Sequence, residues 1–274
     1  MTDVKGRTAF ITGGANGIGL GIARSIARAG AKLALVDLDA DALKRAKAEL
    51  QDITAVETYQ LDVRDRAAYA ATADAVEAAL GPVSLLFNNA GIAGGVSVAN
   101  FSYELWDWHI GINLMGVING VQTFLPRMIK HGLGGHIVNT ASGAGLAATG
   151  SGVMYTTAKF GVVGMSESLN IELATNGIGV SVLCPGMVAT NIVQRSADGT
   201  PKPEAALTKE QEQAIAKRTD MIGQLLLTMG VSVDKVGEIV LQAVQDNSLY
   251  IHTDRIIEAP FKSRTKAILD AMPG

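Results

Sequence analysis

The segment T-G-G-A-N-G-I-G occupies residues 12–19, directly after the apolar run Arg7–Ile11 and at the start of an amphipathic stretch that begins at Gly17. A glycine-rich turn between a strand and a helix lets a phosphate approach the backbone and lets the helix pack closely on the strand. The first turn of such a helix presents free N–H groups and a positive dipole end to a pyrophosphate. Because many βα turns use glycine for structural reasons, the position between strand and helix is what makes this turn a candidate dinucleotide site.

Outward from this turn, short apolar runs alternate with longer amphipathic stretches. Several runs, such as Lys32–Asp37, are apolar at both alternating positions, which is typical of parallel strands covered on both faces. This alternation predicts right-handed βαβ units in one α/β domain over residues 1–274, with a doubly wound parallel sheet of about seven strands. The expected strands are Arg7–Ile11, Lys32–Asp37, Val56–Gln60, Val83–Phe87, His136–Thr140, Val180–Leu183 and Leu249–His252, and the expected helices between them are Gly17–Ala29, Asp39–Leu50, Ala67–Leu80, Tyr103–Lys130 and Tyr155–Asn176.

One region, residues 191–230, contains no expected strand. The polar stretch Arg195–Pro203 predicts a loop, and the apolar spacing within Thr208–Met229 predicts a helix. A long insertion late in an α/β domain is typical of a lid over a binding site, and an exposed helix pair at a subunit interface is the alternative. Residues 254–274 are expected to form a C-terminal helical tail.

Composition excludes several classes of function. The 274 residues carry 23 basic and 26 acidic side chains, a net charge of −3, and no run of like charge indicates a nucleic-acid or membrane surface. A single cysteine and four dispersed histidines argue against a disulfide framework and against a metal site. The N-terminus lacks an apolar signal segment, and no stretch offers the ~20 apolar residues of a membrane span, so a cytoplasmic protein is expected.

Four polar residues stand at a distinctive spacing. Ser142 follows an expected strand, and Tyr155 and Lys159, four residues apart on one helix face, follow it. A Tyr–Lys pair alone is common by chance. The pattern Ser-x12-Tyr-x3-Lys with an upstream Asn113, a T-G-x-x-x-G-x-G turn and the segment P-G-M-V-A-T at 185–190 is far more specific. From Gly6 to about Thr190 the sequence resembles the classical short-chain dehydrogenases/reductases.

The resemblance implies a Rossmann fold and a tetrad that moves protons while a bound dinucleotide carries hydride. Tyr155 would be the acid/base, and lowering its pKa from ~10 to near 7 requires about 4 kcal/mol. A lysine ammonium ~4 Å away supplies about that much at an effective dielectric of ~20. By analogy, Lys159 lowers the Tyr155 pKa and binds the nicotinamide ribose, Ser142 hydrogen-bonds the substrate oxygen, and Asn113 holds a water on the proton path.

The cofactor expected is NAD. Asp37 ends the second expected strand, where an acid accepts hydrogen bonds from the adenosine ribose hydroxyls and repels a 2′-phosphate. Its neighbours Asn16 and Leu38 are not basic, and Asp39 is better placed than Asp37 to cap the next helix. The cofactor-contacting residues that the resemblance implies are Gly13, Asn16, Gly17, Ile18, Gly19, Asp37, Leu38, Asp62, Val63, Asn89, Ala90, Gly91, Tyr155, Lys159, Pro185, Gly186, Val188 and Thr190.

The substrate expected is a small molecule. The residues expected around the substrate are small or apolar, which favours a fairly hydrophobic secondary alcohol or ketone, such as an aromatic, steroid-like or lignin-derived one. Methionines that merely fill core gaps are the alternative interpretation of part of this set. The set consists of Ile92, Ala93, Gly94, Gly143, Ala144, Met154, Met187 and Val188.

Three other functions remain open. An NADPH-dependent carbonyl or 3-oxoacyl reductase is opposed by Asp37. A non-catalytic dinucleotide sensor is opposed by the complete tetrad, and an epimerase or dehydratase is opposed by the glycine spacing. The stretch Leu249–Asp254 replaces the V-D-G-G tail of many family members. The family is commonly dimeric or tetrameric, so a homo-oligomer is expected, with Tyr103–Lys130 and Tyr155–Asn176 at its interface.

Overall fold

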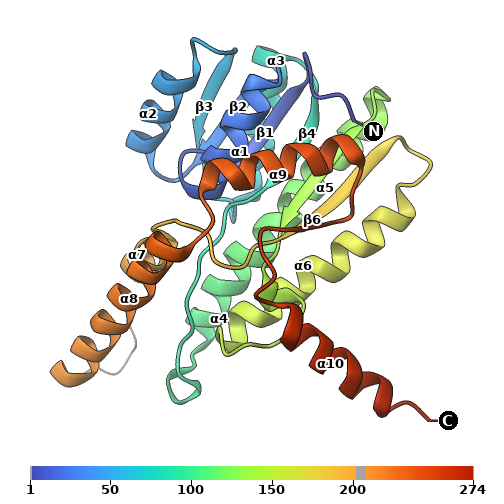
Figure 1. Ribbon diagram of the computed structural model, residues 1–274. Coiled ribbons are helices and arrows are strands. Elements are labelled where there is room, and N and C mark those ends of the chain that lie inside the picture. Colours follow the sequence, from blue (N-terminus) through green and yellow to red (C-terminus); the bar gives the residue numbers. More distant parts are fainter. Residues whose placement is uncertain (1, 202–207, 274) are drawn as a thin grey trace.

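A parallel sheet of seven strands forms the centre of the protein (Figure 1). The computed structural model describes residues 2–201 and 208–273, and its strands lie in the order β3-β2-β1-β4-β5-β6-β7, with every neighbouring pair parallel. The doubly wound sheet is therefore confirmed. The strands are β1 Thr8–Thr12, β2 Lys32–Asp37, β3 Val56–Gln60, β4 Val83–Asn88, β5 Gly135–Thr140, β6 Ile178–Cys184 and β7 Tyr250–His252.

Helices cover both faces of this sheet. One face is covered by α1 (Gly17–Arg28), α2 (Ala40–Leu50) and α9 (Val233–Asp246). The other is covered by α3 (Arg66–Leu80), α5 (Gly116–His131) and α6 (Val153–Glu172). The strand order reverses between β1 and β4, so the connections that follow these strands leave toward opposite faces. Such a switch point opens a crevice at the carboxyl ends of the strands, and ligands bind there in open α/β sheets.

The two helices α1 and α9 approach each other closely because glycines face each other at their crossing. A Cβ on Gly21 would overlap the carbonyl oxygen of Val233, and a Cβ on Gly237 would overlap the carbonyl oxygen of Gly21. This contact buries the apolar face of α1, including Ile22 and Ile26, under α9. Helix α9 was not anticipated from the sequence, although Ser232 caps its first turn and Asn247 ends it in a left-handed conformation.

The long helix expected over Tyr103–Lys130 is interrupted. It consists of α4 (Tyr103–Ile110), a π-helical turn at Gly111–Met115, and α5. A π turn inserts one extra residue into a helix and is frequent at functional sites. Here the extra residue rotates Asn113 into the protein, where it is fully buried. The expectation of one continuous helix was wrong because nothing in the local apolar spacing marks such an insertion.

The region expected to form a lid is helical from its start. Helix α7 (Ile192–Gly199) occupies most of the stretch that was expected to be a loop, because Ser196 inside it is buried against the protein. Pro203, at the end of that stretch, lies outside the described residues. Helix α8 (Lys209–Met229) matches the expected helix, and Thr208 and Gln211 form a capping box at its start. In Figure 1, α7 and α8 stand away from the sheet.

The C-terminal tail forms α10 (Glu258–Asp270), which projects from the body on the side away from α8 (Figure 1). Its described contacts are with α6, where the Arg264 guanidinium lies 5.0 Å from the centre of the Phe160 ring. Within the described residues, no helix is long and apolar enough to cross a membrane. The same residues contain no group of three or more side chains placed to hold a metal ion.

A neutral histidine lies near the amino-terminal end of strand β5. His136 on β5 is fully buried, and its Nε2 lies 2.8 Å from Ser181 Oγ. Because the Ser181 hydroxyl donates to the Ser248 carbonyl, it accepts the proton of His136 Nε2. Burial lowers the pKa of His136 to about 4.

We expect His136 to make the protein less stable in acid. The unfolded chain has a histidine pKa of ~6.5 and therefore binds a proton between pH 6.5 and 4 that the folded protein excludes. The contribution is absent above pH 6.5 and grows to about 2 kcal/mol of lost stability at pH 5. Urea unfolding at pH 7.5 and 5 measures it. His136→Gln, which does not titrate, should show a correspondingly smaller difference in unfolding free energy between the two pH values. An unchanged pH difference in His136→Gln contradicts the prediction.

Candidate active site

The glycine turn sits at the carboxyl end of β1, at the switch point of the sheet. Gly13 and Gly17 have positive φ angles of 61° and 52°, which side chains disfavour. A Cβ on Gly19 would overlap the Gly13 carbonyl oxygen and would lie 2.7 Å from Asn89 Nδ2. The turn therefore needs glycine at these positions, and α1 starts there with its first N–H groups directed into the crevice.

Asp37 and Asp39 lie next to this turn, at the end of β2. The Asp37 carboxylate accepts hydrogen bonds from the backbone N–H groups of Ala15 at 3.3 Å and Asp39 at 3.2 Å. These bonds join the glycine turn to β2. The Asp37 side chain is 11% exposed, so one edge of its carboxylate stays accessible. Asp39, as expected, caps α2 by accepting from the Ala42 N–H.

Thr12 connects the ends of β1 and β4. Its hydroxyl accepts from the backbone N–H groups of Asn89 and Ala90 at 2.9 and 3.0 Å, and the Asn89 amide donates to the Thr12 carbonyl at 3.1 Å. These bonds place the N-N-A-G segment, residues 88–91, along the glycine turn. Thr12 was not among the expected site residues, although it is the first residue of the glycine motif.

The four residues of the expected tetrad come together above β4 and β5. Asn113, on the π turn, accepts from the Ile92 N–H at 3.1 Å. A Cβ on Gly91 would lie 3.0 Å from Asn113 Oδ1 and 3.6 Å from Lys159 Nζ, so only glycine leaves room between these two groups. Lys159 Nζ lies 5.7 Å from the centre of the Tyr155 ring, and the Ser142 side chain hydrogen-bonds Tyr155.

Lys159 is held by the backbone rather than by Tyr155. Its ammonium donates to the Thr140 carbonyl at 2.9 Å, and burial lowers its pKa to about 8. Part of the Tyr155 residue is accessible, yet its hydroxyl lies deep enough that burial raises its pKa, which the Ser142 hydrogen bond opposes. The effect of Lys159 on the Tyr155 pKa stays a prediction.

Two buried amide and hydroxyl groups of this site lack a partner among the described residues. They are Asn113 Nδ2 and Thr140 Oγ1. Asn16 Nδ2, in the glycine turn, is also buried without a hydrogen-bond partner among the described residues. A buried polar atom without a partner costs about 1–3 kcal/mol. Their position along one crevice, from the glycine turn to Lys159, fits an elongated polar ligand.

Comparison with known proteins agrees with this geometry. The family model of the short chain dehydrogenases matches residues 7–201. The chain belongs to this family. A C alpha-dehydrogenase from a Sphingobium species is 36% identical over 99% of this chain and 88% of its own length. A D-threitol dehydrogenase from Mycolicibacterium smegmatis is 39% identical over 72% of this chain and 75% of its own length.

A solved structure resembles the whole chain. A short-chain dehydrogenase/reductase from Burkholderia phymatum, in complex with NAD, is 34% identical and has a TM-score of 0.90, with 100% of this chain and 98% of that chain covered. This short-chain dehydrogenase is thus an oxidoreductase with the crevice of a nicotinamide dinucleotide enzyme. The fit rests on its own residues: the glycine cradle, the unpartnered Asn16 amide and the accessible edge of Asp37.

The expected adenine contact at Asp62 is already engaged by another residue. The Arg64 guanidinium binds both oxygens of the Asp62 carboxylate, at 2.6 Å to Oδ2, and this hydrogen bond lowers the pKa of Asp62. Val63 is buried, and its carbonyl accepts from the Asn119 amide at 2.9 Å. Leu38 is 58% exposed and so offers an apolar surface at this end of the crevice.

The C-terminal tail supports the other end. Asp254 accepts from the Met187 N–H at 3.1 Å, and Thr253 Oγ1 accepts from the Gly186 N–H at 3.0 Å. Ile257 packs on Gly143, where a Cβ would come within 3.3 Å of it. The tail therefore orders both the loop after β5 and the P-G-M-V-A-T loop after β6, and it does so without packing on α8. Sequence reasoning missed Asp254 because its partners are backbone groups far along the chain.

The expected substrate residues divide into two groups. Gly143, Ala144, Met154 and Val188 are buried and offer little surface, so for Met154 the packing alternative applies. The remaining members are at least partly accessible, and these are Ile92, Ala93, Gly94 and Met187.

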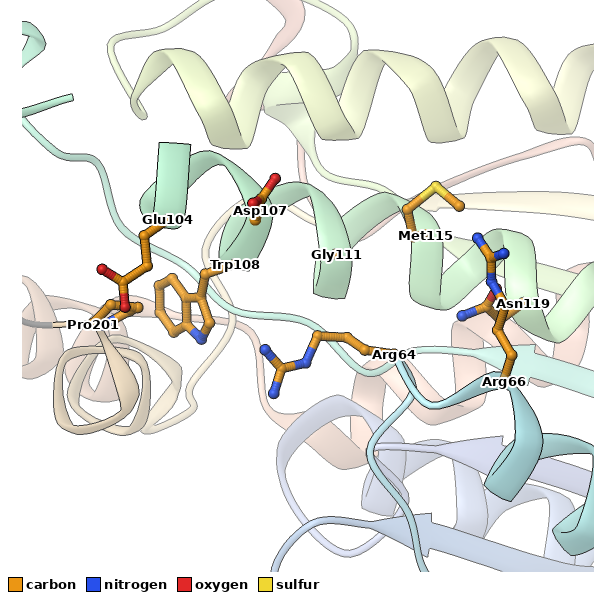
Figure 2. A pocket seen from close by; sticks show the side chains of 9 residues that line it. All are labelled: Arg64, Arg66, Glu104, Asp107, Trp108, Gly111, Met115, Asn119 and Pro201. Atoms are coloured by element: carbon orange, nitrogen blue, oxygen red, sulfur yellow. The ribbon is translucent and has the colours of Figure 1, made fainter. Parts of the chain in front are cut away.

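A separate hollow lies outside this site (Figure 2). It has a volume of about 680 Å³ and a mixed lining that includes Arg64, Glu104, Asp107 and Trp108. It contains no member of the tetrad, and its charged wall is unsuited to a hydrophobic alcohol. Cys184, buried under the site, has its pKa raised to about 12 by burial, as fits an unreactive core residue.

Proposed function

We propose that this short-chain dehydrogenase uses NAD to interconvert a secondary alcohol and a ketone on a fairly hydrophobic small molecule. The observation that carries the proposal is the convergence of Asn113, Ser142, Tyr155 and Lys159 at one end of a crevice whose other end is the glycine turn. Each of the four side chains has a polar neighbour at this end of the crevice. A dinucleotide lying along the crevice would reach both ends.

The residues divide the chemistry among them. Tyr155 removes the hydroxyl proton of the alcohol, or returns it to the ketone oxygen in the reverse direction. Ser142 donates a hydrogen bond to the same oxygen and stabilises the charge that develops on it. A bound nicotinamide ring supplies the hydride acceptor or donor. Asn113, with its unpartnered amide, holds a water that passes the proton from the tyrosine side to solvent.

Lys159 is the charge that makes Tyr155 a usable base. With a pKa of about 8, roughly nine-tenths of this lysine is protonated at pH 7. Burial alone raises the Tyr155 pKa, so an ammonium that approaches the phenolate is needed to reverse the shift. The Lys159 ammonium donates one of its protons to the Thr140 carbonyl. It can keep that bond and donate its other protons to a ribose and to Tyr155.

NAD is the proposed cofactor because Asp37 borders the adenosine end. We expect Asp37→Ala to narrow the preference for NADH over NADPH at least tenfold, since the variant loses the acceptor for the ribose hydroxyls and the repulsion of a 2′-phosphate. Fluorescence titration of both reduced dinucleotides measures the two Kd values. Asp41→Ala, an exposed acid on α2, is the matched control and should leave the ratio unchanged. An unaltered ratio in Asp37→Ala would remove the basis for proposing NAD.

The proposed substrate class rests on the accessible residues Ile92, Ala93 and Met187. None of them is charged, which disfavours a carboxylate or phosphate on the substrate. The Sphingobium relative, named a C alpha-dehydrogenase, is similar to this protein over nearly the whole chain, including the tail. The D-threitol dehydrogenase covers less of the chain. We therefore favour a hydrophobic alcohol over a polyol.

The experiment that tests the function is NAD⁺ reduction, followed by absorbance, with a panel of hydrophobic and polar secondary alcohols. The Tyr155→Phe protein serves as the blank. Turnover of a hydrophobic subset that disappears in the variant supports the proposal and identifies the substrate class. Turnover of polyols alone would overturn the substrate class, and dinucleotide binding without any turnover would favour a sensor.

A homo-oligomer is part of the proposal. Apolar residues of α5 would fit either a subunit interface or packing on the sheet, and three of them, Val117, Val121 and Phe124, are buried within the protein. Among the exposed apolar residues on α4, α5 and α6, Tyr103 and Ile171 have the largest accessible fractions, 89% and 75%. Sedimentation velocity of the wild-type protein and of Ile171→Asp tests whether this surface joins subunits.

A further inference from the structure

A basic residue from the lid region reaches the adenosine end of the crevice. Arg195 lies on α7, and its Nη2 lies 3.3 Å from Asp39 Oδ2 and 3.9 Å from Asp37 Oδ1. The side chain is 43% exposed, so a ligand can reach it. Asn16 and Leu38 occupy the positions that would carry a basic clamp for a 2′-phosphate, and neither is basic; a positive charge comes instead from a segment more than 150 residues further along the chain.

Helix α7 is held in place at a second point. The Ser196 hydroxyl donates to the Ile192 carbonyl at 2.6 Å and accepts from the Ala93 N–H at 2.8 Å. Ser196 is 3% exposed, so this bond is shielded from water. At its C-terminal end α7 passes Trp108, which lies 3.8 Å from a Cβ placed on Gly199. The helix thus spans from the loop after β4 to the end of β2, and Arg195 is positioned by a fixed element.

The carboxylates around Arg195 already have other partners. Asp37 accepts from Ala15 and Asp39 backbone N–H groups, and Asp39 Oδ1 accepts from Ala42. The edge that faces the ribose therefore carries two negative charges and one positive charge. An acid at the end of β2 excludes a 2′-phosphate, whereas a nearby arginine accommodates one. Both elements are present here, on different segments.

We propose that Arg195 is a cofactor-specificity residue, whose guanidinium faces the adenosine 2′ position and weakens the exclusion of a 2′-phosphate by Asp37. The choice between the two dinucleotides is then set jointly by β2 and α7, and NAD is preferred by a margin smaller than Asp37 alone would give. This inference rests on the proposed dinucleotide function. The inference adds to that function a residue of the lid region that influences which dinucleotide is bound.

Fragments of the two cofactors test the inference without turnover. Isothermal titration calorimetry of the full-length protein compares 5′-AMP with 2′,5′-ADP, which differ only in the 2′-phosphate. We expect Arg195→Gln to raise the Kd of 2′,5′-ADP roughly tenfold, about 1.4 kcal/mol, and that of 5′-AMP less than threefold. The difference should shrink when the ionic strength rises from 50 to 500 mM, because exposed charges are then screened.

Two further variants separate a specificity role from a structural one. Asp39→Asn keeps a helix-capping side chain and removes one of the two negative charges, so it should tighten 2′,5′-ADP severalfold, opposite to Arg195→Gln. Arg218→Gln, at an exposed arginine of α8 with no ion pair among the described residues, is the matched control and should change neither Kd.

The outcomes are distinct. If Arg195→Gln weakens both fragments equally, or tightens both, Arg195 is a general anion contact or a latch and the inference is overturned. If the ratio of the two Kd values does not change, it is also overturned, while the dinucleotide function stands. If the wild-type protein binds neither fragment, nor either intact dinucleotide, the proposed function itself fails.

Discussion

Replacing Tyr155 with phenylalanine is expected to lower kcat by about 10²–10⁴-fold, the usual contribution of general acid–base catalysis. The Tyr155 phenol lies next to Ser142 and Lys159, where it can exchange a proton with a substrate oxygen. Dinucleotide affinity should change by less than about twofold, because the contacts at the glycine turn and Asp37 are untouched. Steady-state kinetics with a competent alcohol, together with NADH titration, measures both quantities.

The matched control for this substitution is Tyr103→Phe. Tyr103 lies on α4 with 89% of its surface exposed, so the loss of its hydroxyl should leave kcat within about twofold. Retention of more than a tenth of wild-type turnover in Tyr155→Phe would show that another group moves the proton. A pH profile adds a second readout: the acidic limb of kcat/KM for alcohol oxidation, which reports Tyr155 as the base, should disappear in Tyr155→Phe and persist in Tyr103→Phe.

Gly19→Ala is expected to have the second-largest effect, on dinucleotide binding. The added methyl group would overlap the Gly13 carbonyl oxygen and approach Asn89 Nδ2 at 2.7 Å, so the turn must shift. Overpacking of this kind costs about 1–3 kcal/mol, which corresponds to roughly a tenfold to hundredfold rise in the Kd of NADH if the shift falls on the phosphate-facing N–H groups. Fluorescence titration measures the Kd, and thermal unfolding shows how much of the cost falls on stability.

Gly164→Ala provides the comparison for this change. Gly164 lies in α6, and no atom lies within 4 Å of a Cβ placed there, so alanine should stabilise the helix by up to about 1 kcal/mol and leave NADH affinity unchanged. If Gly19→Ala binds NADH as tightly as Gly164→Ala does, the turn does not form the dinucleotide cradle.

The sheet and the tetrad could be predicted from the sequence because each depends on local signals. The run Leu33–Val36 is apolar at every position, as is typical of a strand covered on both faces. Ser142, Tyr155 and Lys159 carry a spacing that a single strand–loop–helix unit displays directly. Asp39 as a helix cap is equally local. For these features, neighbours in sequence are also neighbours in space.

The remaining features depend on contacts between distant segments. The π turn that buries Asn113 adds one residue within an otherwise regular helix, and no periodicity marks it. Arg195 lay in a polar stretch that resembled a loop, and only the folded chain brings it to Asp37 and Asp39. Asp254 holds backbone groups of the loop after β6, and backbone partners leave no pattern of residue types. Helix α9 was missed although Val236, Val240 and Val244 recur at helical spacing.

The glycine contact between α1 and α9 has a consequence for how the protein is made. Gly21 lies on α1, the helix that follows the glycine turn, and Gly237, which meets it, is synthesised more than 200 residues later. At about 5–20 residues per second, the interval is roughly ten to forty seconds. During that time the apolar face of α1 with Ile22 and Ile26 has no cover from α9. We therefore expect truncation before α9 to yield an aggregating fragment rather than a dinucleotide-binding half.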